Sequence, residues 1–193
     1  EGVAIVPSGT DPNKEIKVTA SGEVIFTGVD KQTKGSWQKK YGSEGYLICG
    51  AGEKIPEKTK INFMNGETHI WQNKTQDIQA IKTPDGKANI AATRSHPLHE
   101  IIEFNFDDGK EHEVALYFLD WDRKVRWSVV DIIDANTRKI LHSYNLTDYS
   151  QGVYLIYNMK GNLQCRLTNV WTRRYQKSSD VGFSAIFFSP VKQ

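Results

Sequence analysis

The chain has 193 residues, the length of one domain, with 38% hydrophobic and 25% charged residues. Its 25 basic and 23 acidic residues leave a net charge of +2, so no basic surplus favours binding to nucleic acid or to a membrane surface. No apolar stretch approaches the roughly 20 residues of a membrane span. Residues 1–21 begin with a run rich in Pro, Gly, Ser and Asp and are predicted to be a linker or N-terminal extension, and residues 22–193 a single folded domain.

Alternation with period two predicts strands along almost the whole chain. Residues 33–46 form a glycine-rich connection into a strand, and residues 73–83 are the one stretch that suits a helical turn. The strand over 101–106 ends in the turn Asp108-Gly109, and residues 114–119 are apolar on both faces, which is typical of a central strand. Residues 126–144 and 152–170 each read as strand, turn and strand, and residues 181–189 close the chain. Turns about every ten residues predict an all-β antiparallel sandwich or barrel.

The two cysteines, Cys49 and Cys165, both occupy apolar positions in predicted strands. We interpret them as buried thiols, with one disulfide as the alternative. The five histidines show no complete zinc-ligand spacing and are expected at the surface or in loops: His69, His96, His99, His112 and His142.

Catalytic motifs are absent from the sequence, which has no nucleophile elbow, no phosphate loop and no HExxH. The most suggestive polar cluster is LDWDRKVRW, in which Asp120 and Asp122 share one side of an extended chain. A glycoside hydrolase needs its two carboxylates on opposite faces of the sugar bond. We therefore predict no catalytic residues, and we expect these carboxylates to accept hydrogen bonds from sugar hydroxyls or to hold a cation.

The tryptophans all lie at predicted strand ends or in loops, beside polar residues: Trp37, Trp71, Trp121, Trp127 and Trp171. Sugars present C–H faces that stack on indole rings and hydroxyl rims that suit charged and amide side chains. Each Trp is also a good cap for a sandwich core, but we do not expect all five to be core residues.

Five segments together resemble a β-sandwich module appended to polysaccharide-degrading enzymes of bacteria, such as rhamnosidases, other glycoside hydrolases and lyases. They are DKQTKGSWQKKYGSEGY, WQNKTQDIQAI, ALYFLDWDRKVRWSVVDIID, YSQGVYLIYNMKGNLQCRLT and SAIFF, spanning Asp30 to Phe188. The chain departs from the family pattern at Gln79, where the family has Arg, at Tyr157, where it has Trp, and at Ala185, where it has Gly.

The resemblance implies a jelly-roll, galactose-binding-like fold and a non-catalytic module that tethers a larger secreted enzyme to its polysaccharide. It places the protein outside the cell, in the periplasm or on the cell surface, with a catalytic domain in the same parent chain. Many modules of that architecture hold a structural calcium ion, for which the oxygen-rich loops at Asp30 and at Asp107-Asp108 are candidates, although the metal ligands are unassigned.

The expected sugar-binding residues are Trp37, Trp71, Arg94, Asp120, Trp121, Asp122 and Arg126. Arginines beside aromatic rings suit an acidic or sulfated glycan, although the near-neutral net charge makes this preference weak. Two other readings stay open: a structural accessory domain with no ligand, and a small lyase or glycosidase whose activity depends on Asp120.

Overall fold

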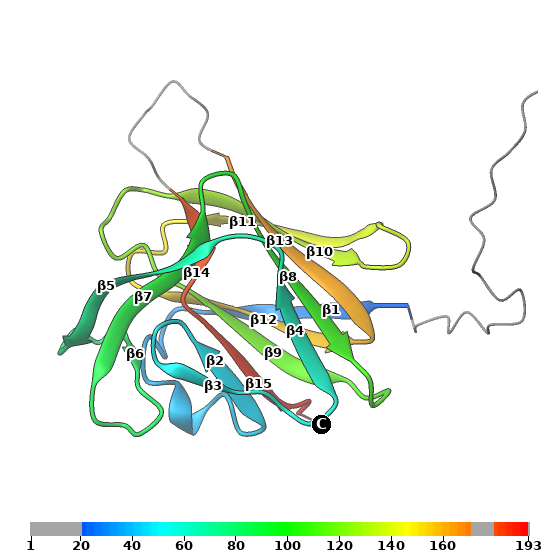
Figure 1. The fold of residues 1–193 in the computed structure, drawn as a ribbon, viewed down its shortest axis with the longest axis horizontal. Coiled ribbons are helices and arrows are strands. Elements are labelled where there is room, and N and C mark those ends of the chain that lie inside the picture. Colours follow the sequence, from blue (N-terminus) through cyan, green and yellow to red (C-terminus); the bar gives the residue numbers. More distant parts are fainter. Residues whose placement is uncertain (1–20, 171–179, 193) are drawn as a thin grey trace, which may run out of the picture.

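The computed structural model describes residues 21–170 and 180–192, and it confirms the all-β antiparallel sandwich (Figure 1). In this part of the chain the helical structure is a single 3-10 turn, η1 (Trp37–Lys39). The stretch over 73–83, expected to suit a helical turn, instead ends one strand, turns at Asp77 and begins the next. Within the described residues, no helix is long and apolar enough to cross a membrane.

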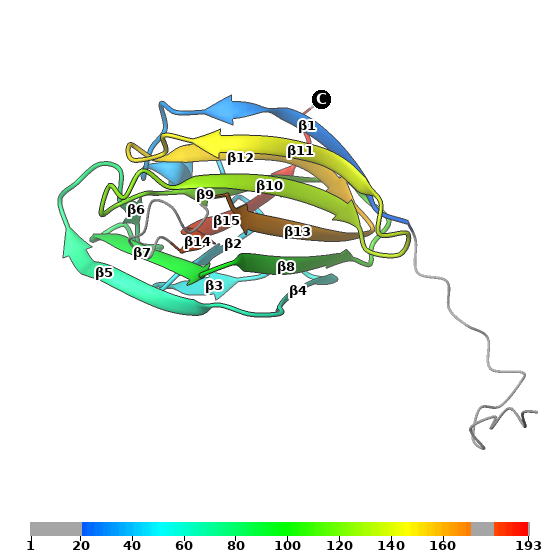
Figure 2. The same cartoon turned by 90° about the horizontal axis from the view of Figure 1, so that it is seen from above.

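The described strands form three sheets. The first contains, in spatial order, β1 (Glu23–Asp30), β12 (Val153–Lys160), β9 (His112–Phe118), β15 (Ala185–Pro190), β2 (Gly45–Ile48) and β3 (Gly52–Lys54). The second contains β11 (Ile140–Thr147), β10 (Trp127–Asp134), β13 (Asn162–Asn169), β8 (His99–Phe106) and β4 (Thr59–Phe63), several of which lie side by side in Figure 2. The third contains β14 (Val181–Phe183), β7 (Asn89–His96) and β5 (Glu67–Thr75), with β6 (Ile81–Lys82) also paired to β7.

The chain changes sheet at turns that the sequence alone cannot distinguish from hairpins. The expected strand–turn–strand over 126–144 is a true hairpin of β10 and β11. By contrast, the turns at Asp108-Gly109 and Lys160-Gly161 carry the chain from one sheet to the other, from β8 to β9 and from β12 to β13. Neighbouring strands therefore come from distant parts of the sequence, as in jelly rolls.

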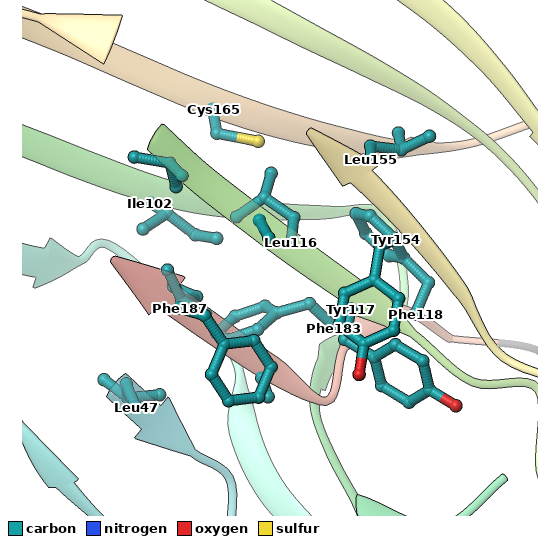
Figure 3. Packing of buried hydrophobic residues seen from close by; sticks show 14 of the residues in the cluster. Leu47, Ile102, Leu116, Tyr117, Phe118, Tyr154, Leu155, Cys165, Phe183 and Phe187 are labelled. Carbon is teal, nitrogen blue, oxygen red and sulfur yellow. The ribbon is translucent and has the colours of Figure 1, made fainter. Parts of the chain in front are cut away.

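Strand β9 is the centre of the core, because all its residues are buried. Figure 3 shows Leu116 on the side of Ile102 and Cys165, which belong to the opposing five-stranded sheet. Tyr117 faces the other way, with its ring centroid 4.5 Å from that of Tyr154 and its hydroxyl 2.6 Å from the Gln79 carbonyl oxygen, to which it donates. The six-stranded sheet is therefore covered on both faces at β9, as the apolar run at 114–119 predicts.

The glycine-rich connection over 33–46 forms part of this second cover. Trp37 is only 4% exposed, its ring is stacked on Phe187 with centroids 4.7 Å apart, and its indole N–H donates to the Lys82 carbonyl at 2.8 Å. Tyr41 packs on Tyr154 with centroids 4.7 Å apart. The expectation that Trp37 stacks on a sugar is therefore wrong, because both its ring and its polar atom have partners inside the protein.

Asp30 fixes the start of this connection. Its carboxylate accepts hydrogen bonds from the Lys40 ammonium at 2.7 Å, the buried Tyr41 hydroxyl at 2.8 Å and the Thr33 hydroxyl at 2.5 Å. The backbone N–H of Gln32 also donates to it, at 2.7 Å. Burial by itself would raise the pKa of Asp30, but these donors hold it well below its ordinary value.

The predictions for the cysteines, the histidines and the N-terminal linker have different outcomes. Cys49 and Cys165 are buried free thiols, as the first interpretation expects, and burial raises the pKa of Cys49 to about 12. His112 is not a surface residue: it is buried against Phe106 and lies between Glu44 and Asp108. The first strand begins at Glu23, and of the predicted linker over 1–21 only Ser21 lies among the described residues.

Replacing Asp30 with alanine is expected to lower the free energy of unfolding by roughly 2–4 kcal/mol, because it leaves the buried Tyr41 hydroxyl and two turn N–H groups without their acceptor. Urea unfolding followed by tryptophan fluorescence measures this loss. The matched control is Asp85→Ala, which removes an exposed carboxylate that also accepts from a hydroxyl and a backbone N–H, and should cost less than about 1 kcal/mol. Equal losses would contradict the role assigned to Asp30.

Candidate functional site

A cavity of about 190 Å³ opens between the three-stranded sheet and the loop that follows β9. Strands β5 and β7 gather at one end of the molecule (left in Figure 1), with β14 behind them. The lining residues are His69, Trp71, Thr93, Ser95, Leu119, Asp122, Lys124, Arg126, Tyr149, Asp180 and Gly182. We refer to this cavity as the tryptophan pocket.

Trp71 comes from β5, the edge strand of the third sheet. His69 and Trp71 are two residues apart, so they share one face of the strand, and their rings meet edge to face with centroids 5.6 Å apart. The pairing with β7 slips at this point, because Ile70 and Gln72 oppose neighbouring residues and leave Trp71 unopposed. Such a bulge bends an edge strand and redirects a side chain, which here lies in the pocket.

Strands β7 and β14 form the base of the pocket. Thr93 and Ser95 follow each other on one face of β7, and Gly182 of β14 pairs with Ser95. A Cβ atom at Gly182 would lie 2.2 Å from the Arg94 carbonyl oxygen and 2.7 Å from the Ser95 Cβ. Glycine is therefore required for the close approach of the two strands beneath the pocket.

Asp120 organises the loop that forms the opposite side. It is 3% exposed, and its carboxylate accepts the backbone N–H groups of Lys124 and Arg126, each at 3.2 Å. The Arg126 guanidinium also donates to it. Two non-glycine residues of the loop, Arg123 and Val125, have φ values of 51° and 56°, a conformation that the bonds to Asp120 hold in place.

Arg126 joins the loop to the rest of the pocket. Its guanidinium donates to both oxygens of Asp122, one of them at 3.3 Å, and to the Asp180 carbonyl at 3.0 Å. The guanidinium also lies 5.7 Å from the centre of the Trp71 ring. Burial alone would lower the pKa of Arg126, but the two carboxylates raise it. Burial alone would raise the pKa of Asp122, but Arg126 and Lys124 lower it.

Of the residues expected to bind sugar, the structure brings three together in the pocket: Trp71, Asp122 and Arg126. Asp120 lies behind them as the anchor of Arg126. Trp121 is outside the pocket lining and packs, partly buried, against the core. Trp127 stands apart on β10 with 42% of its surface exposed, and Trp171 lies outside the described residues.

Arg94 is also separated from the pocket, because it alternates with Thr93 and Ser95 and points to the other face of β7. Its guanidinium lies 4.5 Å from the centre of the Phe63 ring and donates to Glu100 at 3.0 Å and to the Asn65 carbonyl at 2.8 Å. Glu100 is fully buried, and its second oxygen has no hydrogen-bond partner. In this structure Arg94 therefore compensates a buried carboxylate.

The pocket residues that sequence reasoning missed are His69, Thr93, Ser95, Leu119, Lys124, Tyr149, Asp180 and Gly182. Of these, His69 carries the clearest sequence signal, since it precedes Trp71 by two residues in a strand-like run. Leu119 and Lys124 belong to the LDWDRKVRW cluster, whereas the others reach the pocket only through strand pairing or loop packing, which no local pattern shows.

The two proposed calcium loops do not suit the ion. The Asp30 carboxylate is occupied by an ammonium and two hydroxyl donors, and Asp108 faces the His112 ring and the Lys110 N–H. A calcium site needs several convergent oxygen acceptors, not donors. Across the described ranges, no group of three or more His, Cys, Asp or Glu residues could hold a metal ion.

Comparison with known proteins gives little beyond this geometry. No known family model matches the sequence, and no curated protein matches it. Among solved structures, the chain is similar to a family 35 carbohydrate-binding module from Clostridium thermocellum, with 10% sequence identity and a TM-score of 0.38, over 76% of this chain and 98% of that one.

Trp37 and Trp71 should differ sharply in what they contribute to stability. Trp37→Ala empties a buried site and is expected to cost roughly 3–5 kcal/mol of unfolding free energy. Trp71→Ala removes a half-buried ring at an edge strand and should cost about 1 kcal/mol or less. Urea unfolding of both variants, followed by far-UV circular dichroism, provides the comparison. A large loss on Trp71→Ala would place this residue in the core.

Glu100 should make stability fall as pH rises. Burial raises its pKa from the ordinary 4.5 to about 7, against the opposing effect of Arg94. A group whose pKa is raised by folding stabilises the fold below its unfolded pKa, and this contribution is lost as pH rises to the folded value. Between pH 4.5 and 7, Glu100→Gln should therefore remove a decline on the order of 1–3 kcal/mol in unfolding free energy.

The glutamine keeps an oxygen that accepts from Arg94, so the comparison isolates the titration. Chemical unfolding at a series of pH values gives the slope for each protein. Parallel curves for the wild type and Glu100→Gln would show that this carboxyl group titrates normally.

Proposed function

We propose that this chain is a non-catalytic carbohydrate-binding module and that the tryptophan pocket is its glycan site. The observation that carries the proposal is the meeting of Trp71 with the Asp122–Arg126 pair in a cavity at an exposed edge strand. An indole face suits the C–H face of a sugar ring, and the charged pair offers acceptors and donors for its hydroxyl groups. The cavity is smaller than the roughly 300–1,000 Å³ of typical small-molecule pockets, so one sugar ring is the unit it would hold.

The ligand we propose is a neutral glycan. Lys124 and Arg126 are the cationic side chains among the described lining residues, and both contact Asp122. With Asp120 and Asp180 included, three carboxylates face two cations, so the described part of the site has no positive charge to spare for a uronate or sulfate. The expectation of an acidic or sulfated glycan gains no support from this charge balance.

A catalytic role fits the geometry less well. Asp120 and Asp122 both bind Arg126 from the same loop, and Asp120 is buried beneath it. They do not flank a space in which a glycosidic bond could lie between them. A purely structural domain is the remaining alternative, and it would cover Trp71 with a neighbouring domain.

In its parent protein, such a module would hold a catalytic domain close to a polysaccharide outside the cell and so raise the effective substrate concentration. The parent protein that we propose is a polysaccharide-degrading enzyme secreted by a bacterium.

Affinity gel electrophoresis of the isolated chain tests the proposed site. Native gels would contain arabinan, galactan, xylan, polygalacturonate or dextran sulfate, and we expect retardation by at least one of the three neutral polymers. Trp71→Ala should reduce that retardation, with a loss of binding free energy on the order of 1–3 kcal/mol, because an exposed stacking face is lost. The matched control is Trp127→Ala, which removes an exposed indole outside the pocket and should leave retardation unchanged.

Three results would count against the proposal. Retardation by none of the polymers would favour the structural alternative. Retardation that persists in Trp71→Ala but is lost in Trp127→Ala would move the site to β10. Retardation by the anionic polymers alone would contradict the neutral ligand.

A further inference from the structure

A second hollow, of about 570 Å³, adjoins the tryptophan pocket along the same sheet. Its lining residues are Asn65, Gly66, Glu67, Thr68, His69, Ser95, His96, Pro97 and Asp180. Three of them also line the tryptophan pocket: His69, Ser95 and Asp180. The two hollows therefore adjoin at these three residues, and we refer to them together as the groove.

Strand pairing gives the direction of this groove. Glu67 opposes Ser95 and His69 opposes Thr93, so the groove follows β5 and β7 lengthwise. Glu67 and His69 lie on one face because side chains alternate along a strand, and the contact between the His69 and Trp71 rings keeps the Trp71 side chain beside them across the bulge. Four residue steps separate Glu67 from Trp71, which at about 3.3 Å per residue is ~13 Å. A single sugar ring in the tryptophan pocket would leave the Glu67 end of the groove empty.

The second hollow is bounded by backbone that has no room for a side chain. Gly66 has a φ of +82°, and a Cβ atom there would lie 1.7 Å from the unpartnered Oε2 of Glu100. The Arg94 guanidinium donates to the Asn65 carbonyl beside it and to the other Glu100 oxygen. The Arg94–Glu100 pair thus supports the start of β5 from the face opposite to the groove.

We infer that the groove binds two or more consecutive sugar residues of a glycan chain, one on Trp71 and another beside Glu67 and His69. This inference rests on the proposed function and extends it to the length of glycan that is recognised. Glu67 is exposed and supplies carboxylate acceptors for sugar hydroxyls, and His69 contacts both positions. Affinity should therefore rise with chain length until both positions are filled.

The test uses oligosaccharides of the polysaccharide that retards the chain most strongly, made by partial acid hydrolysis and separated by size. Isothermal titration calorimetry of the whole chain would compare the monosaccharide, the tetrasaccharide and the hexasaccharide. We expect the tetrasaccharide to bind at least about tenfold more tightly than the monosaccharide, because it gains contacts in the second hollow.

Variants assign the two positions. Glu67→Ala should weaken binding of the tetrasaccharide by roughly threefold to tenfold and leave the monosaccharide unchanged, whereas Trp71→Ala should weaken both. The matched control is Glu111→Ala, which removes an exposed carboxylate away from both hollows and should change neither.

Equal affinity for the monosaccharide and the tetrasaccharide would overturn the inference while leaving a glycan site at Trp71 intact. A Glu67→Ala variant that binds the tetrasaccharide as tightly as the wild type would also overturn the inference. Retardation by no polysaccharide in the gels would instead remove the proposed function, and this inference with it.

Discussion

The burial of β9 on both faces is the constraint on which the rest of the structure depends. One face needs the five-stranded sheet, and the other needs the connection over 33–46, which brings Trp37 and Tyr41 onto Phe187 and Tyr154. A shift by one residue would turn each side chain to the opposite face, so that Leu116 would meet the connection and Tyr117 the five-stranded sheet, and the packing on both sides therefore specifies the register. The loop that begins at Leu119 leaves this strand directly, and the candidate site therefore inherits a fixed starting point.

The loop after β9 shows how a buried charge pair serves position rather than net stability. Desolvating Asp120 and Arg126 opposes folding, and their mutual attraction and hydrogen bonds offset that penalty. What the pair adds is a defined loop shape: Asp120 binds two backbone N–H groups, and Arg126 is held beside Trp71. A loop restrained in this way loses little further entropy when a ligand binds.

Much of the architecture was predictable because it depends on local patterns. The apolar run at 114–119 indicates a strand covered on both faces, and the period-two alternation indicates the other strands. The turns at Asp108-Gly109 and Lys160-Gly161 are chemically ordinary hairpin turns, yet they carry the chain between sheets, since the partner of each strand is chosen by packing. Similarly, the burial of Trp37 depends on Phe187, a contact that no local window contains.

In the candidate site, too, one part follows from local sequence and another depends on tertiary packing. Asp122 and Arg126 are near neighbours in sequence, so their meeting could be anticipated, whereas their contact with Trp71 requires β5 to pair with β7 and the loop to fold over them. That arrangement also determines how the site can discriminate between ligands. Because its described cations are already held by carboxylates, a charged ligand would have to break existing pairs, while a neutral polyol can bond to the outer edges of those pairs and leave them whole. Selectivity would then come from the spacing of hydroxyl groups along the groove, which is a property of ring stereochemistry and linkage rather than of charge.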